Sequence, residues 1–282
     1  MSNLSVTPQP VEIRGPSAFG GSWKRFWALT WMLAFTEFRL TYFGSALGYL
    51  WSLMRPLMLF GVLYLVFTQI ASFGDEVPDY PVLLLMNIML FNFFTEATQA
   101  SVSAVVNREP LVRKMHFPRL VIPLAVVLTA FMNLAVNLVA VILFLVVYGI
   151  EPMWTWLLLP VALLPFVIIA TGMAMILSAL YVRFRDVAPI WAVAGTALFY
   201  ASPVLYPIDK APEALRNVLE LNPFTGMLEQ MRKWMIDPHA ISGISALGGM
   251  PKALFAIGLV AAIFAVGLWF YEREAPKAAE LL

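Results

Sequence analysis

The chain has 282 residues, of which 61% are hydrophobic and only 12% are charged, whereas soluble domains are about 25% charged. This composition indicates an integral membrane protein. A formal net charge of +1 argues against a nucleic-acid-binding surface, which needs clustered cations beyond those that membrane topology requires. The absence of cysteine excludes disulfides, a thiolate nucleophile and cysteine-based metal sites.

The first 43 residues divide into two segments. Residues 1–21 are polar, contain three prolines and lack the apolar core of a signal peptide, so we expect them to be disordered in the cytoplasm. In residues 22–43, aromatic residues recur at intervals of three and four, while Lys24, Arg25 and Arg39 occupy other positions around the helix. This pattern is typical of an amphipathic helix lying at the membrane interface. A cytoplasmic extension of the first span, packed against other helices, is the alternative.

The rest of the chain predicts six transmembrane helices, because a helix that crosses a bilayer needs about 20 predominantly apolar residues. We expect an all-α integral membrane domain at 44–272 and a cytoplasmic C-terminal tail at 273–282. No sequence repeat relates the two halves. The expected spans lie at about 47–73, 80–106, 120–148, 156–182, 187–206 and 253–271.

Loop charges orient these spans. Residues 74–79 contain three acids and no Lys or Arg, and the turn at 151–155 contains no Lys or Arg either. With these two loops outside, 13 of the 18 Lys and Arg residues lie on the opposite side. The positive-inside rule makes that side cytoplasmic, so both termini are expected in the cytoplasm.

A short polar island at 107–119 separates the second and third expected spans. It is bracketed by Pro110 and Pro118 and is too short to fold alone. Its charged residues are Arg108, Glu109, Arg113, Lys114 and Arg119. Four cations against one acid place this connector on the cytoplasmic side.

The longest external segment, at 203–250, contains two short amphipathic patterns. Residues 211–221 and 225–236 both predict helices, with Thr225 as the N-cap of the second. Neither is long enough to span a bilayer, so we expect re-entrant or surface helices that cap the outer end of a pathway.

Candidate catalytic chemistry is sparse. The two histidines, His116 and His239, fall on opposite sides of the membrane, so they cannot form a metal site within one subunit. A nucleotide-binding loop of the form GxxxxGK[ST] is absent. The acids at 74–79 are read as a solvated turn rather than as the metal-binding carboxylates of a membrane glycosyltransferase. We therefore expect no metal and no catalytic site in this chain.

Glu96 is the one acid that falls inside an expected span. A carboxylate there indicates either a polar pathway or a side chain that reaches cytoplasmic water or a neighbouring cation. Aromatic planes stack on sugar faces, so an aromatic pathway would suit a glycan, although most membrane aromatics are interface anchors or packing. The candidate pathway residues are Trp51, Phe60, Tyr64, Asn92, Glu96, Gln99, Phe199, Tyr200 and Tyr206.

Five motifs, in this order, resemble the membrane subunits of ABC-2 type exporters, and among them the permeases that export O-antigen, capsular polysaccharide and teichoic acid. The resemblance runs from residue 37 to about residue 235 and is specific for the family rather than for the substrate. The motifs are EFRLTYFGSALGYLWSLMRPL (37–57), LVRKMHFPR (111–119) followed by Pro123, RFRDV (183–187), SPVLYP (202–207) and LNPF (221–224).

This resemblance implies a homodimeric permease that is not itself an enzyme. Two copies of a separate nucleotide-binding ATPase subunit would hold ATP and Mg, and this chain would carry no cofactor. The implied cargo is a lipid-linked glycan of the cell envelope, and the implied location is the bacterial cytoplasmic (inner) membrane. By the same resemblance, residues 107–119 would be the segment that couples this chain to the ATPase. The end of the 22–43 helix and the turn at 183–186 would lie beside this segment and frame the site where the ATPase docks.

The resemblance also assigns residue roles. The candidate ATPase-coupling residues are Glu37, Arg39, Arg108, Glu109, Arg113, Lys114, His116, Phe117, Arg119, Arg183, Arg185 and Asp186. The candidate residues of the external gate are Pro203, Asn222, Pro223 and Phe224.

Three other functions compete with polysaccharide export. An ABC-2 exporter of a drug, antibiotic or lipid is the main alternative. A secondary transporter is less favoured, because such folds often show two related halves and charges at the membrane midplane. A membrane-embedded transferase lacks a convincing catalytic cluster.

Overall fold

The computed structural model describes residues 23–42, 48–70, 77–110 and 118–281. At residues 48, 49, 51, 52, 69, 70 and 275–281, only the backbone is described. Within these ranges every secondary-structure element is a helix, which confirms the all-α prediction for the part of the chain that can be seen.

The long helices are α1 (Trp23–Tyr42), α2 (Gly48–Leu65), α4 (Tyr80–Val102), α6 (Val121–Val147), α7 (Leu159–Arg183), α8 (Val187–Tyr200) and α12 (Met250–Leu281). The shorter elements are η1 (Val66–Ile70), η2 (Val106–Arg108), η3 (Trp154–Leu158), η4 (Ile208–Lys210), α9 (Glu213–Leu219), α10 (Pro223–Met235) and α11 (Gly243–Ala246).

Among the residues that the structure describes, four helical segments are long and apolar enough to cross a membrane: Tyr80–Val102, Val121–Val147, Trp154–Arg183 and Met250–Glu274. They coincide with the second, third, fourth and sixth expected spans, so the protein is a multi-pass integral membrane protein. The first and fifth expected spans coincide with shorter apolar segments, Leu53–Thr68 and Val187–Tyr200.

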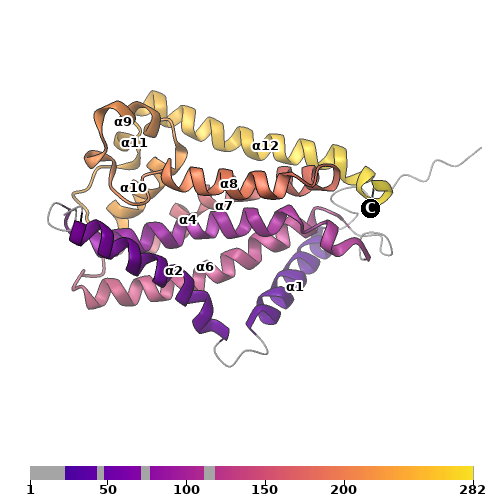
Figure 1. Ribbon diagram of the computed structural model, residues 1–282, viewed down its shortest axis with the longest axis horizontal. Coiled ribbons are helices and arrows are strands. Elements are labelled where there is room, and N and C mark those ends of the chain that lie inside the picture. Colours follow the sequence, from indigo (N-terminus) through magenta and orange to yellow (C-terminus); the bar gives the residue numbers. More distant parts are fainter. Residues whose placement is uncertain (1–22, 43–47, 71–76, 111–117, 282) are drawn as a thin grey trace, which may run out of the picture.

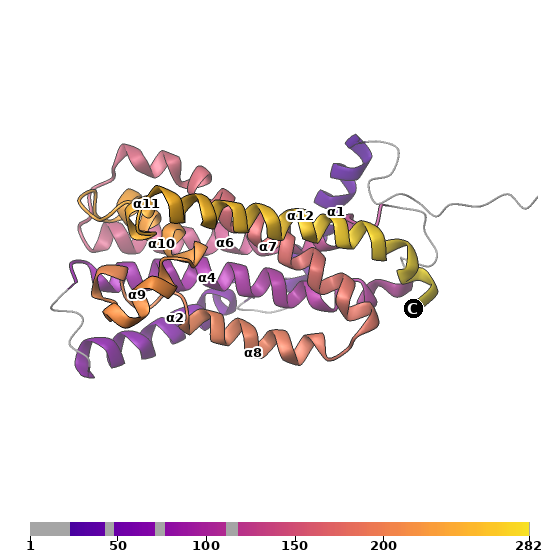
Figure 2. The ribbon, with the colours of Figure 1, turned by 90° about the horizontal axis from the view of Figure 1, so that it is seen from above.

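Helix α4 forms the centre of the bundle. It contacts α2, α6, α7, α8 and α10, and Figures 1 and 2 show it running between them. Residues around its whole circumference are buried, among them Leu84, Met86 and Phe93. A helix that is hydrophobic on all sides fits such a central position.

Helices α7 and α12 pack closely because each has a glycine at the contact. A Cβ atom on Gly172 would lie 2.8 Å from the Cα of Phe264, and one on Gly267 would overlap the carbonyl oxygen of Gly172. Small residues of this kind let two membrane helices approach backbone to backbone.

The bundle has two different ends (Figure 1). Helices α9, α10 and α11 gather beside the start of α12, and we call this the α10 end. At the opposite end, Phe26 at the start of α1 joins one apolar cluster with Val105, Val121, Ala179 and Tyr271. We call this the α1 end, and it brings together η2, the start of α6 and the ends of α7 and α12.

The segment predicted as an amphipathic helix is α1. It packs along α6, with Phe26 and Ala34 buried. Trp23, Trp27 and Trp31 are instead exposed. The aromatic stripe is therefore divided between a face on α6 and a face that is open in the monomer.

The N-cap predicted at Thr225 is wrong. Helix α10 begins at Pro223, and the Asn222 side chain accepts a hydrogen bond from the backbone N–H of Phe224 at 3.0 Å. Asparagine is a strong N-cap residue, and proline suits the first helical position because its missing N–H needs no partner there. The Thr225 hydroxyl donates instead to the Leu219 carbonyl oxygen at 2.6 Å.

Candidate functional site

At the α1 end, an ion pair joins two segments that were predicted to contact an ATPase. The guanidinium of Arg108 in η2 pairs with the carboxylate of Glu37 in α1. Its second nitrogen, Nη1, donates to the Ala104 carbonyl oxygen at 3.0 Å. The two side chains are 16% and 32% exposed, so the pair lies at the edge of the protein rather than in its core.

The other described coupling candidates divide into exposed and buried residues. Arg183, Arg185 and Asp186 lie exposed in the turn between α7 and α8, where the Arg185 guanidinium lies 4.9 Å from the centroid of the Tyr181 ring. Arg39 is also exposed, and Glu109 is half-buried.

Arg119 is 8% exposed, and its carbonyl oxygen accepts a hydrogen bond from the Tyr271 hydroxyl at 2.8 Å. The bond ties the start of α6 to α12, so Arg119 is part of the packing at the α1 end. Arg113, Lys114, His116 and Phe117 lie outside the residues that the structure describes.

A polar cavity of about 610 Å³ opens between α1, α4 and α6, next to the ion pair. Glu37, Glu96, Arg108 and Asn133 all line it. At its wall, Asn133 Oδ1 accepts a hydrogen bond from the buried Tyr42 hydroxyl at 2.6 Å, and Asn133 Nδ2 donates to the Glu96 carboxylate. Glu96 is therefore held by a chain of hydrogen bonds from two other helices.

Asn133 was missed in the sequence, although a signal was present. It lies in the highly apolar α6, where Asn133 and Asn137 are four residues apart and so share one face of the helix. Amides in such a span indicate a polar contact with another helix.

The pathway candidates form separate groups. Phe60 and Tyr64 of α2 stack at 5.7 Å between ring centroids. On α8, the Phe199 ring meets Phe91 edge-on at 5.4 Å, and Tyr200 is 62% exposed.

Asn92, Glu96 and Gln99 share one face of α4, because their spacings of four and three residues match the helical period. Gln99 is exposed, and Tyr206 is half-buried against the small cluster that contains Ile208. Trp51 lies in the part of α2 where only the backbone is described.

At the α10 end, the four gate candidates converge. The Phe224 ring lies 4.8 Å from Phe94, 5.3 Å from Phe91 and 6.0 Å from Phe166, measured between centroids. Pro203 and Pro223 are both buried.

Asn222 ties α10 to the end of α8. In addition to capping the helix, its side-chain amide donates to the Ala201 carbonyl oxygen at 3.1 Å and to Ser202 Oγ at 2.9 Å. The N-terminus of α10 is therefore fixed by two kinds of contact. One is the packing of the Phe224 ring against three other aromatic rings, which we call the aromatic plug. The other is the set of hydrogen bonds from the Asn222 side chain.

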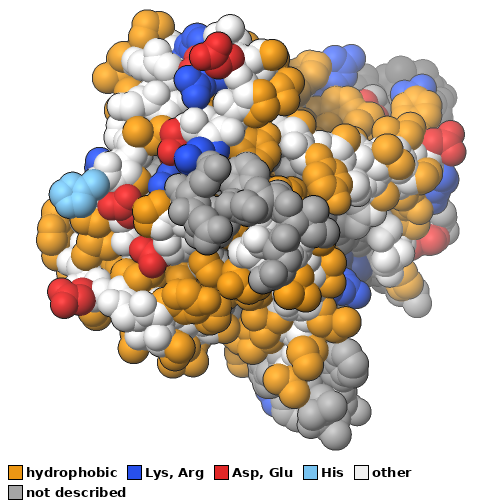
Figure 3. All heavy atoms as spheres, turned by 60° about the vertical axis from the view of Figure 1, so that its left-hand side comes forward, with side chains coloured by type: hydrophobic (Ala, Val, Ile, Leu, Met, Phe, Trp, Pro, Cys, Tyr) orange, Lys and Arg blue, Asp and Glu red, His pale blue; other side chains and the backbone are white. Residues whose placement is uncertain are grey.

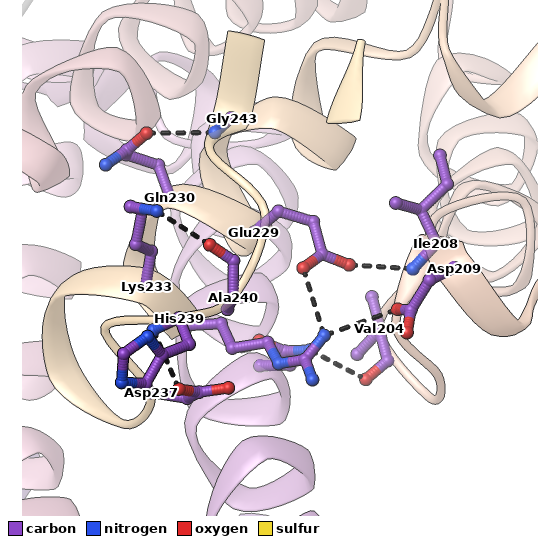
Figure 4. Close-up of polar contacts among 12 residues, drawn as sticks. Val204, Ile208, Asp209, Glu229, Gln230, Lys233, Asp237, His239, Ala240 and Gly243 are labelled. Atoms are coloured by element: carbon purple, nitrogen blue, oxygen red, sulfur yellow. Dashed lines mark hydrogen bonds and ion pairs between the residues drawn. The ribbon is translucent and has the colours of Figure 1, made fainter. Parts of the chain in front are cut away.

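A buried charged group that sequence reasoning missed supports the same helix (Figure 4). Glu229 accepts a hydrogen bond from the Ile208 N–H at 2.7 Å. Arg232 Nη1 lies 3.5 Å from the second oxygen of Glu229 and 3.3 Å from Asp209 Oδ1. Burial raises the pKa of the Glu229 carboxyl, although the Ile208 N–H and the Arg232 charge oppose that change. These contacts join α10 to η4.

Further polar contacts hold the loops of this end. Lys233 Nζ donates to the Ala240 carbonyl oxygen at 2.7 Å, and the Gly243 N–H donates to Gln230 Oε1 at 2.9 Å. Figure 3 shows basic and acidic side chains lying close together on this end, among apolar ones. In the described residues, no group of three or more His, Asp or Glu side chains is arranged to hold a metal ion.

Comparison with known proteins places this arrangement in context. The family described as "ABC-2 type transporter" matches residues 28–236. The O-antigen export system permease protein RfbA of Klebsiella pneumoniae is 28% identical over 202 residues, which are 71% of this chain and 77% of that protein. RfbA of Myxococcus xanthus is 31% identical over 194 residues, or 68% of this chain and 74% of that protein. The polysialic acid transport protein KpsM of Escherichia coli is 23% identical over 222 residues, or 73% of this chain and 80% of that protein.

Proposed function

The chain belongs to the ABC-2 type transporter family, and from this premise we propose that it is the membrane subunit of an ATP-driven exporter of a cell-envelope polysaccharide. The observation that carries this proposal is the similarity to O-antigen export permeases of two organisms and to a polysialic acid transport protein, over about 70% of this chain. The proposed cargo is a lipid-linked glycan of the cell envelope, of the same class as O-antigen or capsular polysaccharide.

The energy for transport comes from a separate ATPase subunit. The sequence contains no nucleotide-binding loop, so ATP and Mg bind to the partner, and this chain acts as a permease rather than an enzyme. Two copies of this chain and two copies of the ATPase form the transporter.

The proposed topology has six spans in the cytoplasmic membrane of a bacterium. In addition to the four long spans, α2 with η1 forms the first span and α8 forms the fifth. These two spans are shorter in the monomer, and the first changes from α2 to η1 along its length. The α1 end faces the cytoplasm, together with both termini, because the cation-rich connectors lie there. Helices α9 and α10 are re-entrant elements at the outer surface.

The coupling mechanism is a displacement of the 107–119 segment. When ATP closes the ATPase dimer, the segment moves with it, and the Glu37–Arg108 pair transmits the motion to α1. The polar cavity beside the pair gives α1, α4 and α6 room to move relative to one another. ATP drives the change only through differential binding of the ATPase to the two states.

Release at the outer side requires α10 to move. Phe224 packs between α4 and α7, so the N-terminus of α10 acts as the gate. The contacts of Asn222 and Arg232 restore its closed position after the glycan has passed.

Co-purification tests this proposal directly. The chain, expressed with the ATPase encoded beside it, should retain that ATPase in detergent, and mass spectrometry should detect a bound lipid-linked sugar. Ion-driven transport by vesicles that hold this chain alone would contradict the proposal.

A charge-reversal variant distinguishes a loss of coupling to the ATPase from a failure of the chain to insert into the membrane. Charge reversal at Arg113 and Lys114 should abolish export while leaving the chain inserted in the membrane. Reversal of Lys24 and Arg25, two adjacent exposed cations at the start of α1, is the matched control and should leave export unchanged. Unchanged export in the Arg113 and Lys114 variant would remove the loop from the mechanism.

A further inference from the structure

An apolar groove of about 520 Å³ lies at the α10 end, apart from the polar cavity and against the outer side of α10. Two candidate spans, α7 and α12, form its walls, and α10 and α11 form its floor. Each residue described along the groove is uncharged. The interior is therefore suited to hydrocarbon rather than to a sugar or an ion.

The groove exists because short side chains line it. Ala253, Ala256 and Ala261 face it from α12, and Gly226 and Gly243 face it from the floor. A Cβ on Gly243 would overlap the carbonyl oxygen of Gly226, so α10 and α11 are in backbone contact there. Gln230 also lines the groove, but its amide oxygen is already occupied by the Gly243 N–H at 2.9 Å.

The depth of the groove matches one leaflet of a membrane. From Ala253 to Ala261, α12 rises about 12 Å at 1.5 Å per residue, and half of the bilayer core is about 15 Å. The surrounding surface is also apolar, since Leu157, Leu254 and Phe255 lie outside the groove and are all more than half exposed. The groove is thus continuous with the lipid-facing surface of two membrane spans.

The volume of the groove, about 520 Å³, leaves room for a hydrocarbon chain along its length.

A polar donor is present at the shallow end. Trp234 lines the groove near the end of α10, where its carbonyl oxygen accepts from Thr155 at 2.6 Å, just before α7 begins. The Trp234 indole makes no hydrogen bond with any residue that the structure describes. Tryptophan is enriched at the level of lipid headgroups, where its N–H can donate to an ester oxygen.

We propose that this groove binds one acyl chain of a membrane phospholipid from the leaflet at the α10 end. The chain fills the space between α12 and the α10–α11 floor, with the glycerol ester next to Trp234. A phospholipid bound there contacts a wall helix and α10 together, so it stabilises the packing of α10. This inference requires only that α7 and α12 span the membrane, and it is independent of the exported cargo.

Photolabelling tests the site. The full chain is placed in nanodiscs that contain a phosphatidylethanolamine with a diazirine on one acyl chain, and labelled peptides are mapped by mass spectrometry. Label should appear on the floor residues Met227 and Leu247, as well as on the outer surface of α7 and α12. Label that is confined to that outer surface would overturn the proposal.

Two adjacent alanines provide a matched pair of variants. Ala261 and Ala262 are both exposed on α12, but only Ala261 lines the groove. Ala261→Trp should abolish most of the label on Met227, whereas Ala262→Trp should leave it unchanged. Equal labelling in both variants would overturn the proposal, as would equal loss.

A second copy of the chain is tested as an alternative occupant. The protein has no cysteine, so Ala261→Cys provides a single thiol. Under oxidation this variant should stay monomeric on a denaturing gel. A disulfide-linked dimer would identify the groove as a subunit contact and overturn the assignment to lipid.

Discussion

At the α10 end, Glu229 and Arg232 are buried against each other, whereas at the α1 end Glu37 and Arg108 form a partly exposed pair beside a cavity. A buried charge that loses its partner is strongly destabilising. An exposed pair contributes only a small free energy, because water and salt replace the partner. The buried contact holds α10 in one position against η4, whereas the partly exposed pair can shift with its surroundings while it still links η2 to α1.

Apolar packing follows the same division. Phe224 has aromatic neighbours on three sides, while the space between α1, α4 and α6 is hollow and polar. Interiors packed at crystal density resist small displacements. We therefore expect the α10 end to move as a unit and the α1 end to adjust locally.

The largest expected effect is at the aromatic plug. Phe224→Ala should lower the free energy of unfolding by about 4 kcal/mol, because it removes a buried ring and leaves a cavity. Thermal unfolding in detergent measures the loss. Phe255→Ala, at a 53% exposed position on α12, is the control and should change little; equal effects would show that Phe224 is not a plug.

The second largest effect on stability is expected at the buried ion pair between Glu229 and Arg232. Arg232→Met should lower the free energy of unfolding by about 3 kcal/mol, because the buried Glu229 carboxyl loses its cation. The double variant Arg232→Met with Glu229→Gln should recover most of this loss, since the glutamine still accepts from the Ile208 N–H. If the double variant is no more stable than the single one, the pair is not the source of the effect.

A smaller effect is expected at the helix cap. Asn222→Ala should cost about 1 kcal/mol through loss of the N-cap of α10. Hydrogen exchange of the first turn of α10 should accelerate at the same time. Asn217→Ala, at an exposed position in α9, provides the comparison and should leave that turn protected.

The smallest effect on stability is expected at the α1 end. Arg108→Gln should lower the free energy of unfolding by about 1 kcal/mol, because it removes a partly exposed pair without placing a like charge beside Glu37. Arg108→Glu should reduce export sharply, because two negative charges then face each other beside the proposed coupling segment. The charge swap Glu37→Arg with Arg108→Glu should restore export in a cell-surface glycan assay. A swap that stays inactive would mean that Arg108 acts through a different partner.

Much of the fold could be predicted from the sequence because helix formation and membrane insertion depend on local patterns. The segments Val121–Val147 and Met250–Glu274 are recognisable from apolar length alone. The amphipathic period predicts the α10 helix, but the N-cap is Asn222 rather than the predicted Thr225, so the helix begins earlier than expected. The convergence of the gate candidates could not be derived from periodicity.

The amino-acid sequence by itself determined that this is a helical membrane protein, which of its connectors are rich in cations, and that no nucleotide-binding loop is present. These properties follow from composition and from intervals of a few residues. Only the tertiary structure decided that Glu37 meets Arg108, that Glu96 meets Asn133, and that Tyr42 completes the chain. Those partners are 71, 37 and 91 residues apart, and which helix faces meet depends on side-chain packing across the whole bundle.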